Sequence, residues 1–225
     1  MASEQSLLIH IGKRWTQVYY ESLTLLDTNV EWTTHDIASL LGDYQFLGAS
    51  LVEKVVISSH VKELTPVFAQ YAKKTLQTEA MIITPGMSTL PLAESTPTDV
   101  VGVIHSHGGE VVYIGAQEQL TISYVNDGYF QGYFQGPELP LSPTSQMPTR
   151  LHLAKSEEAA VIHGAINAVL GSIDSALRTI RPHQDAKVIL YGPLAKWLSP
   201  YIDDAHQLDP HALFRGLSRL IQHVR

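Results

Sequence analysis

Residues 110–134, EVVYIGAQEQLTISYVNDGYFQGYF, carry the strongest structural signal in the chain. They predict a strand that ends in a glycine turn at Gly115, a second strand from Gln119 to Val125, and a third from Tyr129 to Phe134. The last two strands are separated by Asn126-Asp127-Gly128, which favours a tight hairpin because such residues tolerate positive φ. The stretch therefore predicts three consecutive antiparallel strands.

The N-terminus has a similar pattern. Leu7–Gly12 is an apolar strand that ends in glycine, and Trp15–Glu21 is a second strand rich in aromatic and β-branched residues. The residues from Leu23 to Trp32 can supply a third strand. The chain thus begins twice in the same way, which predicts an internal duplication.

Further elements follow the first set of strands. Thr33–Asp36 is typical of a helix start, Glu53–Ser59 of a buried parallel strand, and Val61–Gln77 of a helix. Met81–Ile83 is expected to be one more strand. A long irregular connection then runs from Thr84 to about Asp99, and it marks the predicted boundary between two halves, residues 1–98 and 99–225.

The second half repeats this order. Val100–Ile104 is predicted to be a strand or a tight link, and a long helix is expected from Ser156 to Ile180. Lys187–Gly192 is the strand after that helix, and Pro193–Leu198 is a short helix. The final amphipathic helix, Pro210–Val224, begins with Asp209 as its N-cap.

Two copies of three antiparallel strands, a helix and a further strand predict an α/β protein with a duplicated fold. This is the ribonuclease-H-like, actin-like architecture, also called the ASKHA fold, with two similar halves around a cleft. In such folds the strand turns of the two halves face each other, and the phosphates of ATP normally lie between them.

The amino-acid composition argues against some classes of binding partner and of active site. The net charge is −7 and the sequence has no block rich in lysine and arginine, which argues against nucleic acid or an anionic membrane as the main partner. The sequence has no cysteine, so a thiolate nucleophile or cysteine-type zinc site is excluded. Since the N-terminus has no basic start followed by a long apolar run, we expect a cytoplasmic protein.

The ordered series of segments resembles the type III pantothenate kinases, also described as the Bvg accessory factor family. The segments that carry the resemblance are Ile9–Arg14, Val55–Ser59, Glu110–Gly136, Lys187–Ala195 and Asp209–Leu217. The resemblance implies phosphorylation of pantothenate by MgATP, the first step of coenzyme A synthesis. It also implies a monovalent cation and a homodimer, for which the broad apolar face of the Ser156–Ile180 helix is the expected interface.

The resemblance assigns site residues by position. His10 and Tyr113 stand where the family has its catalytic carboxylates, and Glu118 is the nearest acid in the second turn. Phosphate-binding and substrate-binding positions follow from the same comparison. The phosphate-binding set is Gly12, Lys13, Arg14, Gly115, Ala116 and Gly192, and the substrate-binding set is Gly102 and His105. The family has an aspartate and an arginine in this substrate-binding motif, but residues 102–105 contain neither, and the helix that should follow the motif is largely missing.

Histidine and tyrosine at the two carboxylate positions indicate a degenerate member of the family with weak or absent kinase activity, because imidazole and phenol bind Mg²⁺ poorly. Two readings remain open. The protein is either an enzyme that still uses ATP, with Lys13, Arg14 and Glu118 at the site, or a non-catalytic regulatory module on the same scaffold. A histidine such as His10 on an apolar strand is also typical of a hydrogen-bonded core residue, and Tyr113 of a packing residue that fills the space of a lost acid.

His105-Ser106-His107 suggests different chemistry. Two imidazoles at this spacing on an extended segment point the same way and can share a metal ion. The segment Val101–His107 also resembles the H-x-H strand of the JAMM metalloproteases, with Glu118 where that motif has its acid. The proline that follows the second histidine in that motif is absent. Two interpretations are therefore open, a metal-dependent hydrolase or a chance H-x-H in a glycine-rich loop.

Overall fold

The computed structural model describes residues 6–20, 23–28, 52–139, 154–180, 186–203 and 206–223. The chain divides into two compact units, Met1–Ser106 with Phe214–Arg225, and His107–Leu213. Residues 99–106 and 214–225, which the predicted boundary placed in the second half, group with the first unit.

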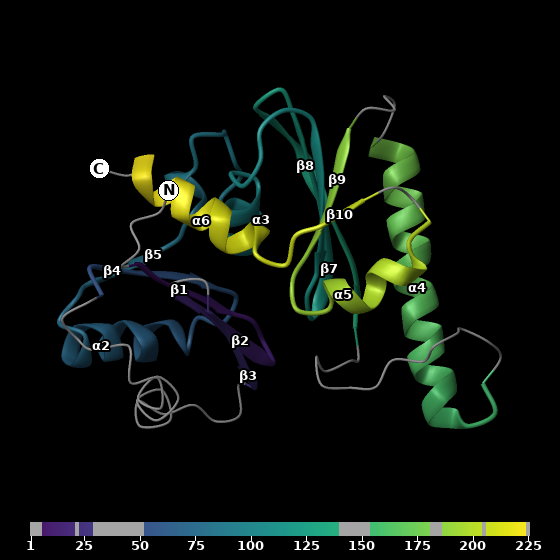
Figure 1. Ribbon diagram of the computed structural model, residues 1–225, viewed down its shortest axis with the longest axis horizontal. Coiled ribbons are helices and arrows are strands. Elements are labelled where there is room, and N and C mark those ends of the chain that lie inside the picture. The colour runs from purple at the N-terminus through teal and green to yellow at the C-terminus, as the bar shows by residue number, and fades with distance from the viewer. Residues whose placement is uncertain are drawn as a thin grey trace. The chain divides into compact units, whose positions relative to one another are not determined.

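The first unit contains a five-stranded mixed sheet (Figure 1). Its strands are β1 (Ser6–Ile11), β2 (Trp15–Tyr20), β3 (Leu23–Thr28), β4 (Lys54–Ser59) and β5 (Ala80–Ile82). Their order is β3-β2-β1-β4-β5, in which β1, β2 and β3 are antiparallel and β4 and β5 run parallel to β1. The described part of the predicted third strand ends at Thr28.

The second unit contains a sheet with the same connectivity. Its strands are β6 (Val111–Ala116), β7 (Gln119–Asn126), β8 (Tyr129–Glu138), β9 (Lys187–Tyr191) and β10 (Gln207–Leu208). Their order is β10-β9-β6-β7-β8, with β6 to β8 antiparallel and β9 and β10 parallel to β6. Each strand therefore has a counterpart in the first sheet, and the predicted duplication is confirmed.

The hairpin between β7 and β8 has the predicted turn. Asp127 and Gly128 both have positive φ, 47° and 81°, as a two-residue turn that matches the twist of the strands requires. This turn sets the pairing of Asn126 with Tyr129.

The described residues of the first unit include the helices α2 (Thr65–Thr75), α3 (Thr98–Val103) and, from Phe214 onward, α6 (Ala212–His223). Within this unit α2 lies on one face of the sheet, and α3 and α6 lie on the other (Figure 1). A short 3₁₀ turn, η1 (Pro85–Met87), lies in the connection before α3. The helix expected to start at 33–36 lies outside the described residues.

The prediction of a strand or link at Val100–Ile104 is wrong, whereas no helix follows Gly102 beyond Val103 in the described residues before β6 begins at Val111. The residues from Val100 to Ile104 form α3 and the turn that follows it, with Val100, Val101 and Val103 fully buried. A short run of β-branched residues has only a weak intrinsic preference for strand, and tertiary packing overrides it.

Packing between α6 and α3 is close enough to require glycine. A Cβ built on Gly216 would lie 1.9 Å from the carbonyl oxygen of Gly102. The guanidinium of Arg219 also donates to the backbone carbonyls of His105 (3.3 Å) and Ser106 (2.5 Å). The end of α3 is thus held against α6 by close packing and by hydrogen bonds.

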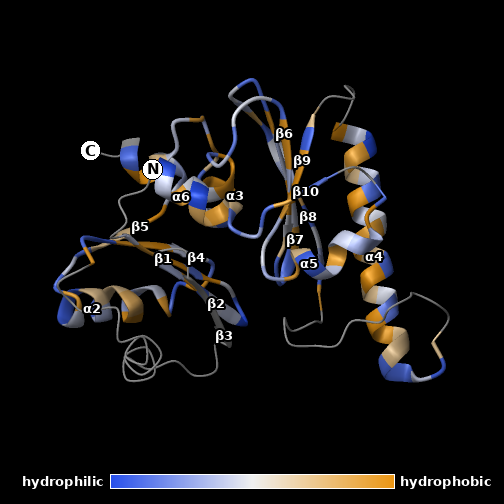
Figure 2. Ribbon diagram, in the orientation of Figure 1, coloured by the Kyte–Doolittle hydropathy of each residue, from blue (hydrophilic) through white to orange (hydrophobic). Residues whose placement is uncertain are grey.

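The second unit has the long helix α4 (Glu157–Ile180), followed after β9 by α5 (Ala195–Leu198) and the 3₁₀ turn η2 (Ser199–Tyr201). The prediction of the long helix is confirmed. Figure 2 shows hydrophobic and hydrophilic residues alternating along α4, as expected for an amphipathic helix. Its buried residues include Ile166, Val169 and Ile173.

Among the described helices, α4 alone is long and apolar enough to cross a membrane. Only 33% of its most apolar window is buried, yet α4 contacts both β7 and β8. It also carries an exposed ion pair between Asp174 and Arg178. The buried residues of α4 thus pack against β7 and β8 in the core of the second unit.

Candidate functional site

The turn between β1 and β2 exposes two cations. The amide of Gly12 donates to the carbonyl of Trp15 at 3.0 Å and closes the turn. Lys13 and Arg14 lie exposed within it, and the guanidinium of Arg14 lies 5.1 Å from the centre of the Trp15 ring. The three phosphate-binding residues predicted in this half therefore share one short turn.

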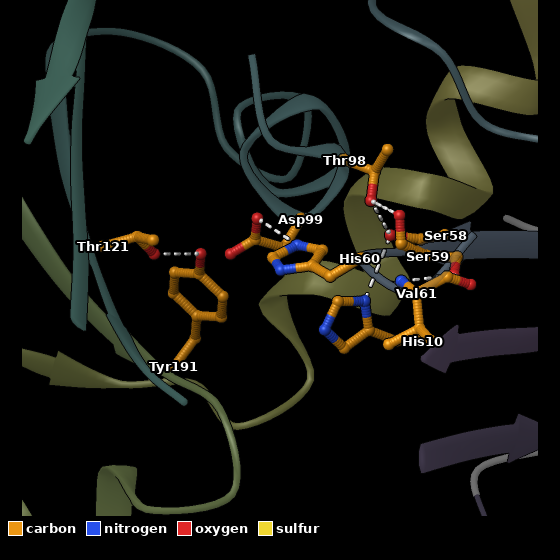
Figure 3. A network of polar contacts seen from close by, with 9 residues as sticks. All are labelled: His10, Ser58, Ser59, His60, Val61, Thr98, Asp99, Thr121 and Tyr191. Atoms are coloured by element: carbon orange, nitrogen blue, oxygen red, sulfur yellow. Dashed lines mark hydrogen bonds and ion pairs between the residues drawn. The ribbon is translucent and has the colours of Figure 1, made fainter. Parts of the chain in front are cut away.

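His10 is buried at the end of β1 and takes part in a hydrogen-bond chain. Its Nδ1 lies 3.1 Å from Ser58 Oγ, Ser58 donates to Thr98 Oγ1 at 3.0 Å, and Thr98 donates to the carbonyl of Ser59 at 3.2 Å. Because the single hydroxyl hydrogen of Ser58 is used on Thr98, His10 Nδ1 is assigned as the donor to Ser58. The chain ties β1, β4 and α3 together (Figure 3).

A carboxylate that sequence reasoning missed lies beside this chain. Asp99, in the first turn of α3, has only 1% of its side chain exposed and accepts a hydrogen bond from His60 Nε2 at 2.9 Å. The rings of His60 and His10 meet edge to face, with centroids 5.3 Å apart. Figure 3 shows Asp99 next to the His60 ring.

Asp99 is ionised despite its burial. Removal from water favours the neutral acid, but the charge of His60, the hydrogen bond from His60, the charge of His10 and the amide of Val100 outweigh it. Together they lower the pKa of Asp99 to about 2. The first unit therefore holds a buried anion against the imidazole of His60, with the His10 ring on the far side of His60 (Figure 3).

A weak local signal for Asp99 was present in the sequence. Pro97-Thr98-Asp99 before an apolar run is typical of a helix start, with proline near the first position and an acid in the first turn. A strand over the apolar run would leave Asp99 at the end of the irregular connection that begins at Thr84. No local pattern connects it to His60, which is 39 residues away.

The two residues predicted to bind substrate lie at the same helix. Gly102 is inside α3, where its carbonyl faces Gly216. His105 follows α3, and its Nε2 lies 3.0 Å from Ser88 Oγ. Their role in substrate binding stays a prediction.

In the second unit, side chains crowd the turn at the end of β6. A Cβ on Gly115 would lie 2.3 Å from Thr121 Oγ1 and 2.6 Å from the hydroxyl of Tyr191, and those two oxygens are 3.3 Å apart. Gly192 has φ +96°, and its Cα faces the carbonyl of Ala116, where a Cβ would approach to 2.7 Å. Both glycines are thus required by close contacts in the predicted phosphate turn.

Tyr113 is fully buried, as expected of a packing residue. Its hydroxyl accepts a hydrogen bond from the amide of His107 at 3.2 Å and donates to the carbonyl of His107 at 3.3 Å. Glu118 is also buried, with 7% exposed. The phenol of Tyr113 therefore holds the segment before β6 by two hydrogen bonds. It makes a structural contact at the position where the family has a carboxylate.

The two histidines of the H-x-H motif have different partners. His105 contacts Ser88, whereas His107 Nε2 lies 3.5 Å from Asp209 Oδ2. Among the residues that the structure describes, no group of three or more histidine, cysteine, aspartate or glutamate side chains is arranged to hold a metal ion. Metal binding by His105 and His107 remains a sequence-based prediction.

Comparison with known proteins gives a distant relative. The chain is 23% identical over 202 residues to the type III pantothenate kinase of Moorella thermoacetica, covering 79% of each protein. No family model matches the chain. The sequence therefore has a distant similarity to a type III pantothenate kinase.

Solved structures resemble the chain over nearly its whole length. A conserved protein from Campylobacter jejuni, described as a Baf family transcriptional activator, has a TM-score of 0.60 at 13% identity and covers 97% of this chain and 98% of its own. The activator of 2-hydroxyisocaproyl-CoA dehydratase from Clostridium difficile, with bound ADPNP, has a TM-score of 0.56 at 8% identity, with 97% and 95% covered. The fold is that of the actin-like ATPases and sugar kinases. At these identities the likeness establishes the fold alone, and the predicted fold class is confirmed.

Proposed function

We propose that this protein is a cytoplasmic pantothenate kinase-like phosphotransferase with weak turnover. The observation that carries the proposal is Asp99, a buried and ionised carboxylate beside the end of β1, in a chain with distant similarity to a type III pantothenate kinase. In the family reaction a hydroxyl of pantothenate attacks the γ-phosphorus of ATP and ADP leaves. Such transfer depends mainly on positioning and charge stabilisation.

The described residues fit ATP better than they fit magnesium. Lys13 and Arg14 suit phosphate oxygens, and the turns at Gly12, Gly115 and Gly192 would hold the phosphates by resemblance. Mg²⁺ prefers several anionic oxygens, whereas the two family positions hold a buried imidazole and a buried phenol already bonded to the backbone. We attribute the weak turnover to this poor metal site, and we propose that the monovalent cation and the homodimer of the family are retained.

A coupled assay with MgATP and pantothenate tests the proposal. We expect slow formation of phosphopantothenate by the wild-type protein and a loss of at least about 100-fold in Asp99→Asn, since a positioned acid or base contributes at least that much. Asp174→Asn is the matched control, because Asp174 is an exposed aspartate paired with Arg178 on α4. Wild-type turnover no greater than that of Asp99→Asn would contradict the proposal.

Lys13→Ala is expected to weaken binding of a non-hydrolysable ATP analogue by about 10-fold, which corresponds to about 1.4 kcal/mol. The reason is the loss of one cation from the exposed turn that follows β1. Isothermal titration calorimetry measures the change. Lys74→Ala, which removes an exposed lysine from α2, should leave the affinity within about 2-fold, and equal losses in both variants would remove Lys13 from the site.

A non-catalytic nucleotide-binding module is the second candidate. It is favoured by the second unit, where the Tyr113 hydroxyl is bonded to the His107 backbone and Tyr191 and Thr121 crowd Gly115. This candidate predicts binding of the ATP analogue without any phosphopantothenate. The assay and the titration together therefore separate the two functions.

A further inference from the structure

We infer that His60 is the group that accepts the proton of the substrate hydroxyl, and that Asp99 is the positioning residue behind it. The inference rests on the proposed kinase function and assigns the base within that site. It follows from the different accessibility of the two partners, from the orientation of the His60 ring, and from the contacts that hold His60 in place.

The two partners differ in their exposure to solvent. The side chain of His60 is 28% exposed, whereas that of Asp99 is 1% exposed. A proton acceptor must come within hydrogen-bond reach of the reacting hydroxyl. The partly exposed His60 is therefore accessible to a substrate hydroxyl, whereas Asp99 is shielded.

The contact between them orients the imidazole. Asp99 Oδ1 lies 2.9 Å from His60 Nε2, and an ionised carboxylate can only accept a hydrogen bond. Nε2 therefore carries the hydrogen, and in the neutral ring the lone pair is on Nδ1. A buried carboxylate that fixes the tautomer of an accessible histidine is the arrangement that makes histidine an effective base in hydrolase triads.

The backbone of His60 is held on both sides. Its amide donates to the carbonyl of Ile11 at 2.8 Å, at the end of β1. Ser59 Oγ donates to the carbonyl of Val61 at 2.9 Å and lies 3.0 Å from the Val61 amide. The turn after β4 is thus fixed, which limits the positions that the imidazole can take.

His10 adds a second constraint. Its ring meets the His60 ring edge to face at 5.3 Å, and its Nδ1 is bonded to Ser58. Asp99 from α3 and His10 from β1 both contact the His60 ring. The site where the family has a metal-binding acid is therefore built here around a carboxylate and two imidazoles.

The proposed step transfers the γ-phosphoryl group of ATP to the substrate hydroxyl. As the hydroxyl oxygen of the substrate forms a bond to the γ-phosphorus of ATP, the bond from that phosphorus to the β,γ-bridging oxygen breaks. The hydroxyl proton passes to His60 Nδ1, and the imidazolium that results is stabilised by Asp99. The products are a phosphomonoester and ADP, and the proton later leaves His60 to solvent.

The test compares His60→Gln, His60→Ala and Asp99→Asn in the phosphopantothenate assay, with purified full-length protein. Glutamine keeps a donor for Asp99 but cannot accept the proton. We expect kcat to fall by at least about 100-fold in His60→Gln while KM stays within about 3-fold. His211→Gln, a change at an exposed histidine, is the control and should keep wild-type kcat.

Chemical rescue distinguishes a base from a structural residue. Added imidazole is expected to restore at least about 10-fold of the lost turnover in His60→Ala and none in Asp99→Asn. Wild-type kcat in His60→Gln, or lost turnover in His60→Ala that imidazole does not restore, would overturn the inference and leave the kinase proposal intact. Absence of turnover in the wild-type protein overturns the kinase proposal itself, and with it the assignment of a base.

Discussion

Gly216→Ala is expected to lower the free energy of unfolding by about 2 to 3 kcal/mol, because overfilling a packed interface forces the backbone to move. The added methyl group would lie 1.9 Å from the carbonyl oxygen of Gly102, and a backbone atom cannot rotate away as the end of a side chain can. The shift would separate α6 from α3 and also disturb the hydrogen bonds from Arg219 to the backbone after α3. Urea denaturation measures the change.

Gly164→Ala is the matched control for this change. Gly164 is an exposed residue within α4, and a Cβ added to it would have no neighbour within 4 Å among the described residues outside its own helix backbone. Alanine should therefore raise stability there by up to about 1 kcal/mol, through its better helix propensity. Similar effects of the two substitutions would show that α6 and α3 are not packed as closely as the structure describes.

Asp99 is expected to make the protein sensitive to acid. Its pKa is lowered from 3.8 to about 2 in the folded protein, so its ionised form stabilises the fold above about pH 4. That stabilisation is lost as the pH falls from about 4 through 2, and the difference in pKa corresponds to about 2 kcal/mol. The wild-type protein should therefore lose about 2 kcal/mol more than Asp99→Asn between pH 5 and pH 2.

The measurement is urea denaturation of both proteins across this pH range. Asp174→Asn provides the comparison, because an exposed pair such as that of Asp174 with Arg178 contributes at most about 1 kcal/mol. Parallel pH curves for the wild type and Asp99→Asn would mean that the carboxylate has no special stabilisation in the folded state.

The same residue shows where sequence reasoning on the site reached its limit. The turns at Gly12 and Gly115, the exposed cations at Lys13 and Arg14, and the loss of an acid at Tyr113 are visible in the printed sequence. The pairing of Asp99 with His60 is not, because it joins a helix start to a strand end 39 residues apart. The family motif at residues 102–105 places its acid at Ile104, five residues after Asp99.

The repeated order of strands and the long helix α4 could be predicted from local patterns in the sequence. These features follow from short-range periodicity and from turn chemistry, such as the positive φ values at Asp127 and Gly128. Local patterns did not predict that Val100–Val103 is helical, that Gly216 lies against Gly102, or that Asp99 is buried against His60. The physical reason is that burial and pairing depend on segments far apart in the chain, and the local sequence pattern holds no record of those contacts.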